Sequence, residues 1–386
     1  MFKDSPKLKN IFFVGFLVSL HLALTAYINS SLLATFVDEK LVGIAYAFGS
    51  LGSLLALLYA PKIFGRLGGQ KFLLLTSGLS SLSLLALAYA KNAWIAIPVF
   101  IIYFALNTLL LFSLDELLKI FSKDSSTGKI RGFYIAVINI AWILSQVASG
   151  KILVGFQFKT IYIIAFVIMV LFFLASLFGL RKIPDPKYDE VKNLRYIKEF
   201  FQNINLFRGY VLSFLLQFFY CWMVVYTPIY LSAHLGFSWA EIGTIFAIML
   251  IPFSIIPFHL GRYADKVGER RLLISGFAIA AAATLSLFFI TEHSIWIWAA
   301  LLFITRIGAA TIEVMSDAYF FKHIKPENEE YVGVYRSAAP VSYLIGPLLA
   351  SVVFLFVPEF NYLYLVLGAI MLYGVYLSST INRDDI

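Results

Sequence analysis

The sequence predicts an all-α integral membrane protein whose twelve transmembrane helices form two pseudo-symmetric six-helix bundles. Three observations lead to this fold class. Hydrophobic residues make up 61% of the chain and charged residues only 13%, whereas soluble domains carry roughly a quarter charged residues. Apolar runs of about 20 residues, enough to cross a bilayer, recur along almost the whole chain. Short sequence features also recur in the second half of the chain, which indicates an internal repeat.

The apolar runs are expected to be helices, because backbone polar groups in lipid must be satisfied within the segment. The alternating segments of about ten residues that mark a membrane β-barrel do not occur in the sequence. The first run is too long for a signal peptide and lacks a small-residue cleavage site, so we interpret it as a retained span. The expected spans are 11–33, 41–60, 72–90, 93–117, 133–155, 159–180, 209–232, 239–259, 272–290, 294–318, 333–356 and 361–380.

The charge distribution predicts the orientation of these spans. Most Lys and Arg residues lie in segments on the side of the two termini, and the opposite side carries only Lys40, Lys91, Lys151 and Lys159. The positive-inside rule therefore places both termini in the cytoplasm. The net charge of +8 is spread over separate short segments, so it indicates topology and excludes a nucleic-acid-binding surface. The short loops are typical of the cytoplasmic membrane of a prokaryote.

A linker is predicted to join the two bundles. The expected domains are an N-terminal bundle at 1–180, a cytoplasmic linker at 181–208 and a C-terminal bundle at 209–386. Asp185 and Pro186 suit the first turn of a helix. Apolar residues then recur at helical spacing, which predicts an amphipathic helix on the cytoplasmic membrane face: Val191, Leu194, Ile197, Phe201 and Ile204.

The clearest repeated feature is a basic, glycine-containing segment after the second and after the eighth apolar run, at 61–71 and 261–271. The two copies are about 200 residues apart, and the offset extends to acidic and basic residues outside them. The matched positions are Arg66 with Lys266, Gly68 with Gly268, Lys71 with Arg271, Asp115 with Asp317, and the segment 142–146 with 343–347.

These segments resemble the conserved loop of the major facilitator superfamily. The second copy matches that loop at Gly261, Asp265, Lys266, Gly268, Arg270 and Arg271, whereas the first has Gly65 in place of Asp and Pro61 in place of Gly. The resemblance covers essentially the whole chain and implies a secondary transporter that works by alternating access between its two bundles. The departure at Gly65 puts one contact between the bundles in doubt.

The resemblance also implies a gate formed by the charged residues of these segments. Asp265 would meet the positive end of helix five in the opposite half, and Arg270 or Arg271 would reach Asp317. Arg66 or Lys71 would reach Asp115 or Glu116 in the first half. A purely topological role for the charges remains an alternative. The predicted gating residues are Arg66, Gly68, Asp115, Glu116, Arg131, Gly261, Asp265, Lys266, Gly268, Arg270, Arg271, Asp317 and Arg336.

Charged residues inside the tenth span mark the predicted substrate site. Arg306, Glu313 and Asp317 are seven and eleven residues apart, so they lie on one face of a helix. Charged side chains in a membrane are costly and usually functional. Arg306 can bind a carboxylate or phosphate group, and Glu313 can carry a proton. A structural ion pair between the two residues is the alternative.

Polar and aromatic residues of other spans complete the predicted site. His21, Thr25 and Asn29 form one stripe on the first span, where His21 is a second candidate proton carrier. The aromatic residues Trp222, Tyr226 and Tyr230 occupy the matching positions of the seventh span. The resemblance implies that spans one, four, seven and ten line the substrate cavity. The other expected substrate contacts are Tyr103, Asn107, Asn139, Gln146, Gln217 and Tyr220.

The function predicted from these features is proton-coupled secondary transport of a small organic solute by a monomer. No ATP-binding loop, metal-ligand cluster or catalytic nucleophile motif occurs in the sequence, so we expect neither an enzyme nor a cofactor. An efflux antiporter is an alternative, although the Gly-Pro pair expected in span five is replaced by Ser145 and Gln146 and occurs instead at Gly346 and Pro347. The sequence is also compatible with a receptor or scaffold that does not transport, and with a lipid flippase.

Overall fold

The computed structural model describes residues 6–121, 127–181, 195–324 and 330–381, and these residues form helices and no strand. Twelve of the described helical segments are long and apolar enough to cross a membrane, which confirms the predicted fold class. The chain divides into two compact units, Met1–Asp189 and Glu190–Ile386. This division falls within the linker expected at 181–208, and the exact domain boundaries stay a prediction.

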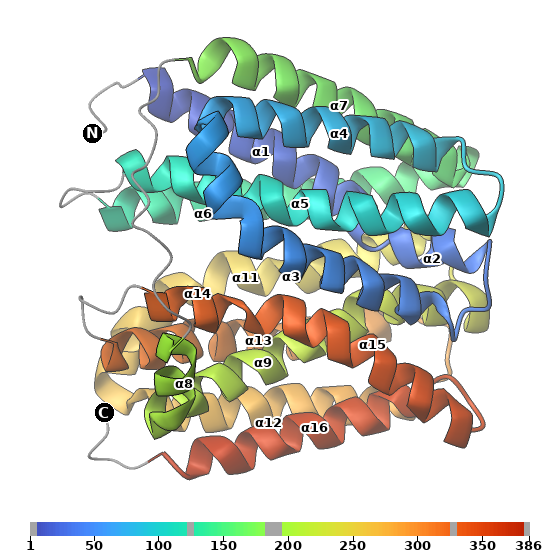
Figure 1. Ribbon diagram of the computed structural model, residues 1–386. Coiled ribbons are helices and arrows are strands. Elements are labelled where there is room, and N and C mark those ends of the chain that lie inside the picture. Colours follow the sequence, from blue (N-terminus) through green and yellow to red (C-terminus); the bar gives the residue numbers. More distant parts are fainter. Residues whose placement is uncertain (1–5, 122–126, 182–194, 325–329, 382–386) are drawn as a thin grey trace. The chain divides into compact units, whose positions relative to one another are not determined.

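The first unit contains six candidate membrane spans, and Figure 1 shows this part of the chain in blue to green. The first span is interrupted at Tyr27 and Ile28, so that it consists of α1 and a short α2. Each remaining span is a single helix. The elements are α1 (Pro6–Ala26), α2 (Asn29–Ala34), α3 (Val42–Leu67), α4 (Gly69–Ala88), α5 (Ala93–Phe121), α6 (Thr127–Gly155) and α7 (Phe158–Gly179).

The second unit repeats this plan after a short helix. The first span of this unit, which is the seventh of the chain, is also interrupted. It breaks at Tyr226 and continues through a short α10 and a π-helical turn, η1. The elements are α8 (Arg195–Gln202), α9 (Ile204–Val225), α10 (Thr227–Ile229), η1 (Tyr230–His234), α11 (Trp239–Val267), α12 (Glu269–Phe288), α13 (Ile295–His323), α14 (Glu330–Arg336), α15 (Ala338–Phe356) and α16 (Tyr362–Ser379).

The packing within the two units follows one pattern. In the first unit, α4 packs on α5 and α7, α3 packs on α5, and α1 packs on α6 and α7. In the second unit, α12 packs on α13 and α16, α11 packs on α13, and α9 packs on α15 and α16. The repeat that the sequence suggested is therefore a repeat of helix neighbours as well as of residues.

The two glycine-containing segments turn at one residue. Gly68 has φ 82° and ψ 151°, and Gly268 has φ 84° and ψ 147°. Side-chain-bearing residues rarely adopt this backbone conformation, which glycine enters readily. Helices α3 and α11 continue to Leu67 and Val267, and the next helix begins directly after each glycine. Most of the residues expected in a loop therefore belong to the flanking helical turns.

We expect Gly68→Ala to destabilise the protein by about 1–3 kcal/mol, because alanine would hold a strained backbone conformation there. Gly65→Ala provides the control. Gly65 lies in the last turns of α3, is exposed, and has no atom within 4 Å of the position a Cβ would take. Alanine at that position should stabilise the helix by up to about 1 kcal/mol. Thermal unfolding of both variants tests this prediction, and a decrease of equal size in both would contradict it.

Helix α8 packs on the second unit through an aromatic residue. Phe200 is fully buried in a cluster with Leu206, Phe320, Val334 and Tyr335. Of the apolar stripe predicted from the sequence, Ile197 packs partly buried against this cluster, Phe201 and Ile204 are 41% and 57% exposed, and Val191 and Leu194 lie outside the described residues. The helix thus has one face on the protein, and its contact with the membrane face stays a prediction.

Candidate functional site

The charged stripe on α13 forms as the helical spacing predicted. Arg306 is buried with 1% of its surface exposed, while Glu313 is exposed and Asp317 is half-buried. Arg306 and Glu313 are separated by two helical turns, or about 10 Å along the helix axis. Both residues lie well inside the span Ile295–His323. The second unit therefore holds a cation and a carboxylate at different depths of one helix.

Tyr220 on α9 connects these two groups. Its hydroxyl donates a hydrogen bond to Glu313 Oε2 at 2.9 Å. Its ring lies 5.6 Å from the Arg306 guanidinium carbon, and the ring of Phe219 lies 5.2 Å from the same atom. Both distances suit a cation–π contact. Tyr220 was expected from the sequence, but Phe219 was missed, because periodicity cannot tell which of several adjacent aromatic residues faces α13.

Arg306 has no anionic partner among the described residues. Its Nη1 atom is buried without a hydrogen-bond acceptor, and neither Arg306 nor Glu313 takes part in an ion pair in the described part of the chain. The alternative of a structural ion pair between Arg306 and Glu313 is therefore wrong for this structure. The helix itself explains the result, since two turns separate the groups and Glu313 is held by Tyr220.

The polar stripe of the first span is hydrogen-bonded within the first unit. His21 Nε2 lies 3.4 Å from Asn107 Oδ1, and Thr25 Oγ1 lies 2.9 Å from the Tyr103 hydroxyl. The hydroxyl of Tyr162 on α7 donates to Asn29 Oδ1 at 2.6 Å. All three stripe residues are buried. This network joins α1 and α2 to α5 and α7, and a contact of the stripe with substrate stays a prediction.

Two further expected residues tie neighbouring helices at matching places. Gln146 Nε2 on α6 donates to the Ala23 carbonyl at 2.9 Å, and Trp222 Nε1 on α9 donates to the Gly346 carbonyl at 2.8 Å. Asn139 and Gln217 are half-buried on α6 and α9. The structure thus gives Gln146 and Trp222 a packing role, and it leaves the substrate contacts expected of this group as a prediction.

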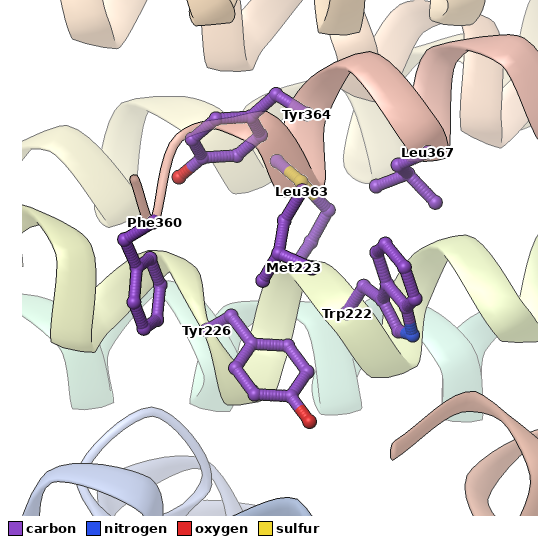
Figure 2. Close-up of a pocket in the computed structure, with 7 residues that line it drawn as sticks. All are labelled: Trp222, Met223, Tyr226, Phe360, Leu363, Tyr364 and Leu367. Atoms are coloured by element: carbon purple, nitrogen blue, oxygen red, sulfur yellow. The ribbon is translucent and has the colours of Figure 1, made fainter. Parts of the chain in front are cut away.

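Figure 2 shows Tyr226 beside a small cavity between α9 and α16. The cavity holds about 10 Å³, which is room for one water molecule rather than for an organic solute. The Tyr226 hydroxyl points away from the α16 side chains, and it is buried without a hydrogen-bond partner among the described residues. The cavity is therefore too small for an organic solute, and a contact of Trp222 or Tyr226 with substrate stays a prediction.

Arg270 and Asp317, two of the expected gating residues of the second unit, make contacts other than those predicted. Arg270 Nη2 donates to the Ser379 carbonyl at 2.7 Å, at the end of α16. Asp317 Oδ1 accepts from the Tyr335 hydroxyl at 2.8 Å, and the charge of Arg336 acts on Asp317. No ion pair of Arg270 or Arg271 with Asp317 is formed among the described residues of this structure, and Arg270 binds the last turn of α16 instead.

An ion pair that sequence reasoning missed lies at the same end of the second unit. Lys322 Nζ on α13 pairs with Glu269 Oε1 at the start of α12. Glu269 is buried, whereas the Lys322 side chain is 53% exposed. The sequence contains an indication of this ion pair, because Glu269 is an acidic residue within the basic segment, directly after Gly268. This pair fixes the glycine-containing segment to the end of α13.

The remaining gating residues stay predictions. In the first unit, Arg66 and Asp115 are exposed and Glu116 is buried. The predicted contact of Asp265 with the opposite half falls outside what the structure describes. The expected residues whose side chains lie outside the described part are Arg131, Gly261, Asp265 and Lys266.

Comparison with known proteins decides the family. The family model described as Major Facilitator Superfamily matches residues 10–255 and 206–381. The chain belongs to the major facilitator superfamily. As a superfamily member it is a multi-pass membrane transporter and not an enzyme. No curated protein sequence matches the chain.

Solved structures support the same fold for this superfamily member. The nucleoside transporter NupG matches with a TM-score of 0.79 and 13% identity, over 97% of this chain and 99% of the other. The D-xylose-proton symporter matches with a TM-score of 0.78 and 14% identity, over 98% of each chain. At these sequence identities the similarity shows the fold and does not identify the transported solute.

The superfamily member has a further polar cluster in its second unit. The cluster lies at the start of α11, whereas Gly268 follows the end of that helix. Ser238 and Glu241 form a reciprocal cap at the start of α11, in which the Ser238 N–H and hydroxyl both donate to Glu241 Oε2 at 2.7 Å. His293 lies 3.2 Å from Glu241 Oε1 and 3.0 Å from the Leu235 carbonyl, and its ring stacks on Phe237. This histidine therefore connects the loop after α12 with the loop before α11 and the first turn of α11.

We expect this histidine to make stability depend on pH. The hydrogen bond with Glu241 raises the pKa of His293 above its usual 6.5. A raised folded-state pKa gives stability that is complete below pH 6.5 and is lost as the pH rises through the folded value. The stability difference between wild type and His293→Gln should therefore be larger at pH 5.5 than at pH 9. Because the side chain is 46% exposed, the effect should be small. Thermal unfolding at the two pH values tests it, and an equal difference at both would contradict it.

Proposed function

We propose that this chain is a proton-coupled secondary transporter that moves a small organic solute across the cytoplasmic membrane by alternating access of its two units. The observation that carries the proposal is the Glu313 carboxylate, which lies within a membrane span, forms no ion pair with any described residue and is held by the Tyr220 hydroxyl. A carboxylate in that setting can be neutralised by a proton and released again without breaking a salt bridge.

The comparisons favour the same kind of activity. One structural neighbour is named as a nucleoside transporter and the other as a D-xylose-proton symporter, so proton symport of a small polar solute is compatible with this fold. The charge distribution of the sequence supports cytoplasmic termini. In this proposal the protein acts as a monomer, and the residues of 61–71 and 261–271 contribute to opening and closing the solute pathway.

A ligand screen tests the proposed function. The purified full-length protein is heated in nanodiscs at two pH values with sugars, nucleosides, organic anions, amino acids and lipophilic cations. A ligand of the folded state raises its apparent melting temperature by mass action. A hit is then tested for uptake into proteoliposomes with an imposed pH gradient. Accumulation that follows the gradient supports the proposal, and binding without any uptake would favour a receptor or scaffold instead.

A further inference from the structure

The buried guanidinium of Arg306 is the group in the second unit that most needs a partner. It has 1% of its surface exposed, and its Nη1 atom has no hydrogen-bond acceptor among the described residues. A buried charge without a counter-charge destabilises a protein strongly, and the cost is larger in a membrane. Such a residue is expected to be balanced by a ligand when no side chain balances it.

The surroundings of Arg306 indicate the shape of that ligand. Phe219 and Tyr220 present aromatic rings at 5.2 and 5.6 Å from the guanidinium carbon, and these rings attract the cation without accepting a hydrogen bond from its N–H groups in the plane. Glu313, two turns along α13, is engaged with Tyr220. The planar N–H groups of an arginine match the two oxygens of a carboxylate.

We propose that Arg306 binds the carboxylate of a monoanionic organic solute, and that this anion and the proton on Glu313 cross the membrane together. This inference rests on the proposed function and names its substrate class. Neutral sugars and nucleosides would leave the guanidinium of Arg306 without a direct counter-charge. The phosphate monoester is a less suitable ligand, because it carries about 1.5 to 2 negative charges near neutral pH.

A charge count in the second unit explains why the anion and the proton would move together. The charged or titratable groups that act on Glu313 are Tyr220, Asp317 and Arg336, and the last two balance one another. In the empty site Arg306 and Glu313 carry opposite charges about 10 Å apart along the helix, so the net charge is zero although the two groups form no direct pair. When the solute carboxylate pairs with Arg306 and a proton from the bulk neutralises Glu313, the site is again neutral. Binding of only one of the two leaves a net charge inside the membrane, which is costly.

Paired probes test the inference on the full-length protein in phosphatidylcholine nanodiscs. The pairs are gluconate with glucose and benzoate with benzamide, and glucose 6-phosphate serves as the phosphate monoester. At saturating concentration at least one carboxylate should raise the apparent melting temperature by about 2 °C or more, while its neutral partner should not. The shift should vanish in Arg306→Gln and persist in Lys151→Gln, which removes a charge from an exposed position.

Two further measurements test the inference, and the first does so even if the Arg306→Gln variant does not fold. Without ligand, Arg306→Met should melt above wild type, because it removes a buried charge that has no direct partner, while Glu313 can bind a proton and stay neutral. A lower melting temperature would show that the chain itself satisfies Arg306, and would overturn the inference. A phosphatidylglycerol nanodisc that stabilises wild type but not Arg306→Gln, without added solute, would also overturn it in favour of a lipid headgroup.

The remaining outcomes separate this inference from the proposed function. No shift with any carboxylate, or an equal shift in Arg306→Gln, overturns the carboxylate site. Proton-driven uptake of a neutral solute that survives Arg306→Gln does the same and leaves the proposed function intact. A carboxylate that binds through Arg306 but is never taken up supports the site and contradicts the proposed function.

Discussion

Replacing Glu313 by Gln should abolish proton-driven accumulation of the solute while exchange of solute across the membrane continues. Glu313 is the carboxylate held by Tyr220 within the α13 span, and glutamine keeps its size and hydrogen-bonding capacity but cannot carry a proton. For one proton per solute without net charge movement, a gradient of one pH unit supports about tenfold accumulation, since one pH unit corresponds to about 1.4 kcal/mol. Wild-type proteoliposomes should approach that ratio, whereas the variant should stop at equal concentrations.

Two measurements separate coupling from general loss of function. Solute counterflow, in which labelled solute exchanges for unlabelled solute without a proton gradient, should remain in Glu313→Gln. The matched control is Glu292→Gln, which makes the same change at an exposed loop position and should behave like wild type in both assays. If the Glu313 variant still concentrates solute in response to the pH gradient, the proton is carried elsewhere, and His21 becomes the next candidate.

The second large effect is expected at Gly308, where α13 packs against α12. A Cβ atom at this position would lie 2.6 Å from the Gly276 carbonyl oxygen and 2.7 Å from the Ala280 nitrogen. Both are backbone atoms, so a side chain fits only if the helices separate. Small residues allow such close approach of membrane helices. Overpacking usually costs about 1–3 kcal/mol and occasionally more, so we expect Gly308→Ala to melt well below wild type and Gly308→Val to fail to fold.

The same substitution should affect the site, because Gly308 lies two residues from Arg306 on α13. Separation of α13 from α12 would move Arg306 relative to Phe219 and Tyr220. The matched control is Gly333→Ala, since a Cβ there would have no atom within 4 Å. Thermal unfolding and size-exclusion behaviour in detergent measure the effect. A Gly308→Ala protein as stable as Gly333→Ala would show that the two helices are less closely packed than in this structure.

The features that depend on chain periodicity were predictable from the sequence. The twelve spans follow from hydropathy, because a membrane leaves the backbone few alternatives to a helix. The common face of Arg306, Glu313 and Asp317 follows from the helical repeat. The equivalence of Gly68 and Gly268 was visible in the two matching segments, and both residues adopt the same unusual backbone conformation.

The partners of the polar residues could not be predicted in the same way. The bond between Tyr220 and Glu313 joins positions 93 residues apart, and that between His21 and Asn107 joins positions 86 apart. Helical periodicity gives the face of each residue but not the neighbouring helix or its depth. For the same reason the sequence offered no sign that Arg270 would bind the end of α16.

The measurement that tests the central claim most directly is the internal pH of proteoliposomes that contain the wild-type protein and a trapped pH-sensitive dye. Addition of the stabilising solute outside, without an imposed gradient, should acidify the lumen as solute and protons enter together. The signal should be absent without solute, in protein-free liposomes and in Glu313→Gln. Solute entry into wild-type vesicles at constant internal pH would contradict proton-coupled transport through Glu313.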